Sequence, residues 1–254
     1  MAERILIIPD THFPDYDKRL WKSVLEVVGA LEPDEIIHIG DLMDLPQPSR
    51  WTKGTRAEFE GSVYQDAANT VKFILEPLRG VYSGPIRIHE GNHDARPRIY
   101  MEKYAPALAE TEMFNFEKLL GFDELGIDRL PDFYPVAPGW LTTHGHLGGI
   151  RLNQNAGQTA LNAAKRIGKS IVMGHTHRAG ISSFTTGLHG LTDTLTGVEV
   201  GHIMDPKKVT YLKGATGNWQ QGLALLTIDG KHTTPTLIPV SEGKMTIDGK
   251  VYKV

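Results

Sequence analysis

The chain has no cysteine among its 254 residues, so it can form neither disulfides nor thiolate metal sites. It also lacks any apolar run of transmembrane length. Residues 1–4 lead directly into a short apolar run, without the long hydrophobic segment and cleavage site of a signal peptide. A formal net charge of −3 argues against a protein that coats nucleic acid, although an enzyme that binds a few phosphates locally stays open. These absences favour a cytoplasmic protein with no part in a membrane.

The composition is that of a globular protein. Hydrophobic residues make up 40% of the chain and charged residues 22%, so a full core is expected. No repeat, low-complexity tract or linker divides the sequence. We therefore expect one domain over residues 1–254, with a β-rich C-terminal half from about residue 179.

Strand and helix patterns alternate along the first part of the chain. Residues 4–8 and 36–39 are apolar runs typical of buried strands. Between them, apolar residues at helical spacing from Leu20 to Leu31 predict a helix that ends before Pro33. A strand, a helix and a second strand in this order indicate a βαβ unit with parallel strands.

The same patterns predict the later elements. Helices are expected at 59–78 and about 153–167, with short ones around 113–120. Further strands are expected at 85–90, 141–143 and 170–173. In the tail, short Thr/Val/Ile/Leu runs between glycines predict antiparallel strands, including 209–213, 223–228 and 233–240.

Metal-ligand residue types follow five of the expected strands. The segments are Asp10-x-His12, Gly40-Asp41-x-x-Asp44, Gly91-Asn92-His93-Asp94, His144-Gly145-His146 and Gly174-His175-x-His177. If the strands lie side by side in parallel, their carboxyl ends converge on one edge of the sheet. Carboxylate, amide and imidazole groups together suit divalent metals. A strand-end aspartate is often only a turn or helix cap, but five such segments favour a metal site.

In this order, the five segments resemble the signature of the calcineurin-like metallophosphoesterase superfamily. That signature is Asp-x-His, Gly-Asp-x-x-Asp, Gly-Asn-His-(Asp/Glu), a lone His-Gly and Gly-His-x-His, and it is matched here over roughly the first 180 residues. The resemblance implies an α/β fold, namely a four-layer α-β-β-α sandwich of two mixed β-sheets flanked by helices. The metal site would lie at the C-terminal ends of the strands.

The resemblance also implies two bound divalent metals. The expected ligands are Asp10, His12, Asp41 and His177 for one metal, and Asp41, Asn92, His144 and His175 for the other. Asp41 would bridge the two, which requires a carboxylate with two usable oxygens. Mn is the expected metal, with Fe, Zn, Ni and Co as alternatives.

The reaction implied is hydrolysis of a phosphoester. Two metals about 3.5–4 Å apart lower the pKa of a shared water, and a hydroxide that bridges them would attack phosphorus. His93 would stabilise or protonate the leaving oxygen, and Asp44 would orient His93. The bridging carboxylate of Asp41 and the His93–Asp44 pair are the core of the functional prediction.

Several nearby residues receive weaker assignments. Asp94 is expected to shape its loop by hydrogen bonds. His146 competes with His144, but the strand-end position favours His144 as the ligand and leaves His146 beside the metals or facing the substrate. Arg96 and Arg178 are suited to bidentate phosphate contact, with a surface salt bridge as an equal alternative.

The remaining histidines are expected to have structural or surface positions, and one loop has two possible roles. His38 and His89 lie inside strands and are expected to be packed, whereas the tail histidines His189, His202 and His232 are expected on the surface. The loop that carries Arg50, Trp51 and Lys53 could line a substrate groove. Trp51 would then be available for base stacking, with simple loop packing as the other interpretation.

The class of substrate is narrowed chiefly by a departure from one branch of the superfamily, the phosphoprotein phosphatases. In the phosphoprotein phosphatases of the superfamily, Arg-Gly follows the second signature, whereas Leu45-Pro46 stands there in this chain. No separate cap domain is evident, which suits a phosphodiesterase acting on nucleotides or nucleic acid, as in the small bacterial and phage-type members grouped with DNA-repair nucleases. The alternatives are a phosphomonoesterase, either a nucleotidase or a phosphoprotein phosphatase, and a non-catalytic scaffold of the same fold.

Overall fold

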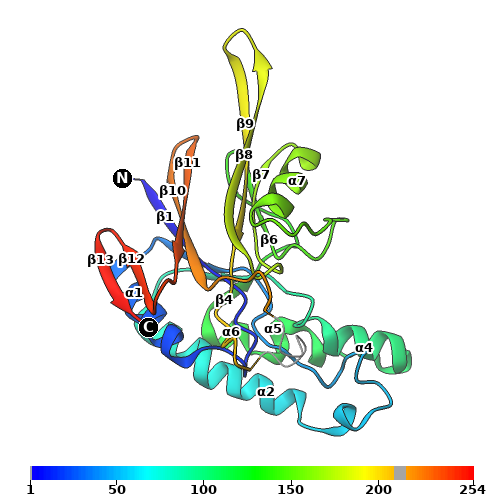
Figure 1. Cartoon of the computed structure of the whole chain (residues 1–254). Helices are drawn as coiled ribbons and strands as arrows, with labels where there is room; N and C mark the ends of the chain where they lie inside the picture. The colour runs from blue at the N-terminus through cyan, green and yellow to red at the C-terminus, as the bar shows by residue number, and fades with distance from the viewer. Residues whose placement is uncertain (1, 209–215) are drawn as a thin grey trace.

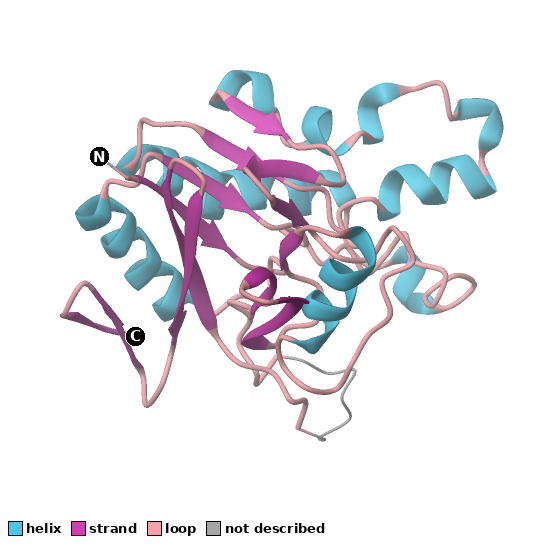
Figure 2. Cartoon of the chain, turned by 90° about the horizontal axis from the view of Figure 1, so that it is seen from above, coloured by secondary structure: helices cyan, strands magenta, loops and turns pink. Residues whose placement is uncertain are grey.

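Two mixed β-sheets lie face to face with helices on their outer sides (Figures 1 and 2) in the computed structural model, which describes residues 2–208 and 216–254. The strand predicted at 209–213 lies outside the described residues. Among the described residues, no helix is long and apolar enough to cross a membrane.

The first sheet has six strands in the order β11-β10-β1-β2-β3-β4. Its four parallel strands are β1 (Glu3–Ile8), β2 (Glu35–His38), β3 (Ile86–Ile88) and β4 (Ile127–Arg129). The antiparallel strands β10 (Gly222–Asp229) and β11 (His232–Pro239) extend it beyond β1. Helix α1 (Lys18–Leu31) joins β1 to β2, so the predicted βαβ unit is confirmed.

The second sheet has five strands in the order β5-β6-β7-β9-β8. They are β5 (Tyr134–Ala137), β6 (Trp140–Thr143), β7 (Ser170–Met173), β9 (Leu191–Val200) and β8 (Ala179–Leu188). Strands β6, β7 and β9 are parallel. The long β8–β9 hairpin extends away from the rest of the molecule in Figure 1. A separate hairpin of β12 (Lys244–Ile247) and β13 (Lys250–Lys253) ends the chain.

Alternating side chains of β1 show how the layers are held together. Leu6 and Ile8 pack with residues of α1 and of the helices after β2, whereas Ile5 and Ile7 pack against Val172 of β7 and Val198 of β9, between the sheets. On the far side of the second sheet, the alanines of α7 (Gln158–Ile167) pack on Ile171 and Met173. The layers are therefore helix, sheet, sheet and helix, and the predicted four-layer α-β-β-α fold is confirmed.

The prediction of one helix over 59–78 was wrong for the first turn, and the observed helix is irregular further along. Gly61 has a φ of +85°, and the next residue, Ser62, accepts the amide of Gln65 as N-cap, so α2 (Val63–Thr70) begins after them. Phe59 lies in the short helix η1 (Arg56–Phe59) and is 81% exposed. The helix then widens into η2 (Val71–Leu75) before α3 (Glu76–Val81), whose Pro77 has no N–H for the preceding turn.

The other helices are short or begin later than predicted. Helix α4 (Arg96–Tyr104) follows β3, and the segment after it contains η3 (Pro106–Leu108), η4 (Glu112–Phe114), α5 (Phe116–Leu119) and α6 (Phe122–Leu125). Helix α7 begins at Gln158 rather than near 153, because Gly157 at its N-cap has a φ of +80°. From residue 179 on, every described element is a strand, as predicted.

Candidate metal centre

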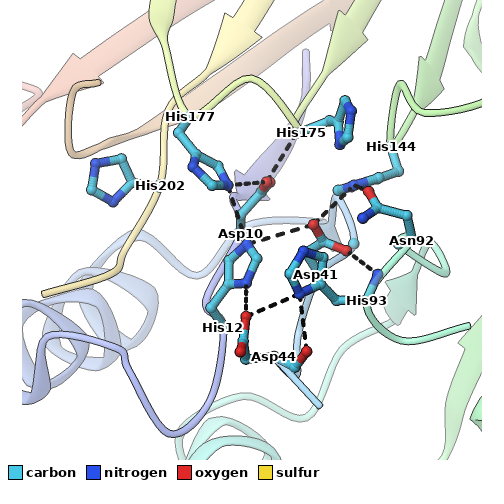
Figure 3. Close-up of polar contacts among 12 residues, drawn as sticks. Asp10, His12, Asp41, Asp44, Asn92, His93, His144, His175, His177 and His202 are labelled. Carbon is cyan, nitrogen blue, oxygen red and sulfur yellow. Dashed lines mark hydrogen bonds and ion pairs between the residues drawn. The ribbon is translucent and has the colours of Figure 1, made fainter. Parts of the chain in front are cut away.

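The five predicted segments meet at one place, but they come from two sheets rather than from one (Figure 3). Three of them follow β1, β2 and β3 of the first sheet, and two follow β6 and β7 of the second. The expectation of a single sheet edge was therefore wrong. Parallel strands of both sheets point their carboxyl ends in the same direction, so the loops of both sheets converge on a shared site.

The predicted ligands of the first metal lie together. Asp10, His12, Asp41 and His177 each contribute a ligand atom, and all four atoms lie within 4.8 Å of one another. His177 Nε2 is 3.3 Å from Asp10 Oδ2 and 3.1 Å from His12 Nε2. His12 Nε2 is in turn 3.5 Å from Asp41 Oδ2. All of these residues are buried.

A second group of candidate ligands shares Asp41 with the first. Ligand atoms of Asp41, His144 and His175 also lie within 4.8 Å of one another. His144 Nε2 is 3.2 Å from Asp41 Oδ2 and 3.2 Å from Asn92 Oδ1. The structure thus places the carboxylate of Asp41 where both groups meet, which is the position a bridging ligand needs.

The chemistry of these atoms fits cations. His12 Nδ1 lies 3.0 Å from Asp44 Oδ1, so its Nε2 is the ring nitrogen that faces His177 Nε2. Asp10 Oδ1 is buried without a hydrogen-bond partner. A buried carboxylate oxygen without a partner is costly in a protein interior, and a cation beside it would satisfy it. The residues present therefore fit two divalent metals.

The backbone at the site is strained in a way that ordinary loops rarely show. Nine described non-glycine residues have positive φ, and four of them are predicted ligands, namely His12, Asp41, His175 and His177. Each such residue costs of order 1–3 kcal/mol, and such strain concentrates at functional sites. The strain indicates a functional site, where the required side-chain positions outweigh the cost of an unfavourable backbone conformation.

Burial and the aspartates together set the ionisation of the imidazoles. Burial lowers the pKa of His177, and burial with the neighbouring His144 charge lowers the pKa of His175 to about 4. Both rings are therefore neutral at pH 7, the form that binds metal. Burial also opposes protonation of His144, but the adjacent Asp41 carboxylate raises the pKa of His144 to about 9. A metal at this position would take the place of that proton beside Asp41.

His93 lies at the side of the cluster and is held by Asp44. Its Nδ1 is 2.9 Å from Asp44 Oδ1 and 2.9 Å from the Asp44 carbonyl oxygen. Burial acts to raise the pKa of Asp44, but hydrogen bonds from His12 and His93 hold that pKa well below its ordinary range. His93, Asp44, His175 and His177 all line a cavity of about 670 Å³, which opens over the cluster.

The three predicted substrate contacts lie around the cluster. Arg96 donates to the carbonyl oxygens of Asp44 at 2.6 Å and Leu45 at 3.2 Å, and its Nη2 is 3.0 Å from His93 Nε2. Arg178 lines the cavity with its Nε buried and unpartnered. His146 packs beside His144 with ring centroids 5.2 Å apart, and its Nδ1 is likewise buried without a partner.

Asp94 joins two ligand loops, as its predicted local role requires. Its Oδ2 accepts the amides of Gly91 at 2.9 Å and Leu42 at 3.2 Å, and its Oδ1 accepts the amide of Met43 at 2.9 Å. The loops approach so closely that a Cβ on Gly91 would meet Asp41 Oδ1 at 2.1 Å, so only glycine fits. The Asp94 carboxylate thus fixes the loop that carries Asp41.

Replacing Asp94 by Asn is expected to weaken metal binding about 10–100-fold, the usual effect of removing a group that holds a metal ligand in place. The amide keeps the size of the carboxylate but turns one acceptor into a donor that faces backbone N–H groups. Competition for Mn²⁺ against a chelating dye measures the effect. The exposed Asp193→Asn serves as the matched control, and equal affinity in the two variants would contradict the role.

His38 and His89 are buried, as predicted. His38 Nε2 pairs with Thr11 Oγ1 in the loop after β1. His89 Nε2 lies 2.8 Å from Thr142 Oγ1 of β6, so it links the two sheets. Burial, with the charge of His144, lowers the pKa of His89 to about 3.

The low pKa of His89 predicts a pH dependence of stability. An unfolded histidine takes up its proton near 6.5, whereas folded His89 stays neutral down to about 3. As the pH falls through this window, the unfolded state gains the proton and the folded state loses stability. Between about pH 6.5 and 4.5, metal-free wild type should lose on the order of 2 kcal/mol more than His89→Gln. Urea unfolding at each pH measures this difference, and parallel pH profiles of the two proteins would contradict it.

One histidine prediction was wrong. His202 was expected on the surface but is 2% exposed, with its ring centroid 5.7 Å from that of His177. Strand β9 runs parallel to β7 and ends at the same edge, so the residues after both strands lie together. The sequence did carry the signal, because Gly201-His202 follows an apolar strand just as Gly174-His175 does. His189 and His232 are exposed, as predicted.

Glu199 is a second residue that sequence reasoning missed. Its buried Oε2 accepts the hydroxyl of Thr176, between the predicted ligands His175 and His177, at 2.9 Å. Its Oε1 accepts the Thr159 amide in the first turn of α7 at 2.8 Å. The carboxylate therefore holds the last ligand loop against a helix N-terminus, which favours negative charge. A single glutamate at the end of a strand gives no local signal for such a role.

Comparisons with known proteins agree with this geometry. The family model for calcineurin-like phosphoesterases matches residues 3–200. The Gene 54 proteins of Mycobacterium phage L5 and Mycobacterium phage D29 are each 50% identical over 255 residues, with 100% of this chain and 100% of each relative covered. Among solved structures, Chaetomium thermophilum Vps29 overlaps 99% of this chain and 97% of its own at a TM-score of 0.48 and 13% identity. Yfce, a phosphoesterase from E. coli, overlaps 98% and 96% at a TM-score of 0.41 and 14% identity. Because the family model covers most of the chain, including every ligand segment, the chain belongs to the calcineurin-like phosphoesterase family.

Proposed function

We propose that this protein is a phosphodiesterase that depends on two divalent metals, Mn²⁺ first among them, and hydrolyses nucleotides or nucleic acid. The observation that carries the proposal is the position of Asp41, which two groups of buried ligand atoms share beside the His93–Asp44 pair. The cytoplasmic location stays a prediction.

The ligand assignment follows the two groups. Asp10, His12 and His177 would hold one metal, and Asn92, His144 and His175 the other, with Asp41 between them. When bound, the two metals would supply an activated water and would withdraw charge from the phosphoryl oxygens. The other chemical steps fall to side chains of the protein.

His93 is the proposed proton donor to the leaving oxygen. Asp44 fixes its Nδ1, so Nε2 is the ring nitrogen that would give a proton to an ester in the cavity, once Arg96 Nη2, now 3.0 Å from it, moves aside. Arg178, whose Nε is buried without a partner at the same cavity, is a proposed contact for a phosphoryl oxygen.

Two cavities meet at the candidate site, and this supports a diester as the substrate. The cavity over the cluster is about 670 Å³, and a second one of about 420 Å³ begins at Asn92. Both are lined in part by Ser49, Trp51 and Arg96. A phosphodiester needs room for a substituent on each side of phosphorus, whereas a terminal phosphate needs room on one side only.

Hydrolysis of two simple esters tests the proposal. With Mn²⁺ present, bis-(p-nitrophenyl) phosphate should be hydrolysed with at least about tenfold higher kcat/KM than p-nitrophenyl phosphate, a difference of about 1.4 kcal/mol in transition-state stabilisation. A preference for the monoester would favour the phosphomonoesterase alternative. Hydrolysis of neither ester by metal-loaded protein would favour the non-catalytic scaffold.

A further inference from the structure

The second cavity has walls that the proposed reaction does not use. It lies between the segment before η1 and helix α4, which are neighbours in Figure 1. Trp51 lines one side, Tyr100 and Tyr104 line the other, and Asn92 stands at the end nearest the metal-ligand cluster. We refer to it as the aromatic cavity. At about 420 Å³, it is within the range of small-molecule sites, about 300–1,000 Å³.

We propose that the aromatic cavity binds the nucleobase next to the scissile phosphate, so that a nucleotide lies with its phosphate at the metal centre and its base on these rings. The inference rests on the proposed function for the identity of the phosphate. It adds a separate binding site and assigns residues to it.

The exposure of the rings is the first support. Trp51 is 75% exposed, and Ile99 in the same wall is 48% exposed. The Tyr100 and Tyr104 ring centroids lie 4.7 Å apart with their planes tilted by 56°, so each ring offers a face of its own to a base. Flat aromatic surfaces in a nucleic-acid enzyme serve for stacking, because every base has a π face.

The charges around the rings are the second support. Arg50 lies over the Trp51 ring at 4.5 Å from its centroid, and Lys53 Nζ lies 3.5 Å from the Tyr104 centroid. Lys103 also lines the cavity. The concentration of cations contrasts with the net charge of −3 of the whole chain. A cavity that combines rings with cations suits a base that carries phosphates, whereas a neutral sugar or lipid would gain nothing from the cations.

The cations over the rings do not block a base. Contact between an exposed cation and a ring is weaker than stacking of a base on that ring. A base can therefore take the place of Arg50 or Lys53 and leave these side chains to pair with phosphates. The two functions, stacking and phosphate contact, are thus present in the same few residues.

The geometry of α4 connects the aromatic cavity to the reaction site. Arg96, Tyr100 and Tyr104 are spaced four residues apart, so they share one helix face at intervals of about 6 Å. Arg96 is at the reaction end, where its Nη2 lies 3.0 Å from His93 Nε2. The rings then follow along the helix, away from the metal-ligand cluster, in the direction that the nucleoside of a bound ester would extend.

Two esters with the same leaving group provide the test. Thymidine 5′-(p-nitrophenyl phosphate) carries a base, whereas methyl p-nitrophenyl phosphate does not. Trp51→Ala and Tyr104→Ala should each lower kcat/KM for the thymidine ester about tenfold, mostly through a higher KM. Hydrolysis of the methyl ester should be unchanged in Tyr104→Ala, because Tyr104 lines the aromatic cavity but not the cavity over the metal-ligand cluster, whereas Trp51 lines both. Trp51→Phe, which keeps an aromatic face, should recover most of the loss.

The control is Phe59→Ala, since Phe59 is 81% exposed and is not among the residues that line the cavity. It should leave both esters unaffected. Equal losses for the two esters in Tyr104→Ala, or no loss for either, would overturn the proposal.

A binding measurement separates this inference from the proposed function. Fluorescence anisotropy of labelled oligothymidylate, with Ca²⁺ in place of Mn²⁺, reports binding whether or not hydrolysis occurs. Binding that weakens about tenfold in Trp51→Ala supports the aromatic cavity even if no ester is hydrolysed. Binding that is the same in wild type and Trp51→Ala overturns it. A larger loss for the oligonucleotide than for the thymidine ester assigns the cavity to a strand along α4, and an equal loss assigns it to a single nucleotide.

Discussion

Asp41→Asn should leave a folded protein that binds less than one metal per chain and hydrolyses phosphodiesters at least about 10³-fold more slowly than wild type. Asp41 Oδ2 lies 3.5 Å from His12 Nε2 and 3.2 Å from His144 Nε2, so its carboxylate belongs to both groups of ligand atoms. An amide has no negative charge to hold two cations together, and with its oxygen at the Oδ2 position its NH₂ would face the His93 N–H that Asp41 Oδ1 now accepts. Loss of this one charge therefore affects both metals.

Metal content by mass spectrometry and hydrolysis of bis-(p-nitrophenyl) phosphate measure the two effects on the same sample. The control is Asp193→Asn, which removes an exposed carboxylate from the β8–β9 hairpin and should behave as wild type. Circular dichroism confirms that each variant folds. An Asp41→Asn protein that keeps a full complement of metals would show that Asp41 does not bridge.

His93→Asn should lower kcat about 10²–10⁴-fold for esters with alkoxide leaving groups, while metal content stays that of wild type. The side chain lines the cavity and touches Asp44 through Nδ1, and it is not among the predicted ligands of either metal, although its ligand atom lies within 4.8 Å of those of His12 and Asp44. The contact of residue 93 with Asp41 is made by its backbone N–H at 2.9 Å, so the substitution keeps that bond. The loss should therefore be one of proton donation.

The leaving group distinguishes proton donation from a purely structural role. p-Nitrophenolate leaves without a proton, so the His93→Asn variant should lose far less activity on bis-(p-nitrophenyl) phosphate than on a dinucleotide. His189→Asn, in the exposed tip of the β8–β9 hairpin, is the matched control. Equal losses for the two substrates would contradict the donor role.

The sequence was sufficient to predict most of the site, because its signals are local. Each ligand segment comes directly after an apolar strand, and a parallel strand places the next residues at the carboxyl edge of its sheet, independently of the rest of the fold. The nine residues predicted as ligands or as the proton-donating pair do lie together (Figure 3). The four-layer fold was predicted from the family resemblance carried by the same segments.

The features that the sequence did not predict depend on contacts between distant segments. The convergence of two sheets, rather than one, depends on packing of Ile5 and Ile7 against Val172 and Val198, which no local pattern encodes. His202 and Glu199 acquire their positions only because β9 pairs with β7. The start of α2 was misplaced because Gly61 and Ser62 override the apolar periodicity that included Phe59. The ligand segments could thus be predicted from the sequence, whereas the pairing of distant strands and the packing of the two sheets could not.

Diffraction from crystals soaked in Mn²⁺, recorded at an energy where manganese scatters anomalously, tests the central claim most directly. We expect two anomalous peaks about 3.5–4 Å apart, one beside Asp10, His12 and His177 and the other beside Asn92, His144 and His175, with the Asp41 carboxylate contacting both. A single peak, or two peaks of which only one contacts Asp41, would contradict the shared carboxylate on which the proposed chemistry depends.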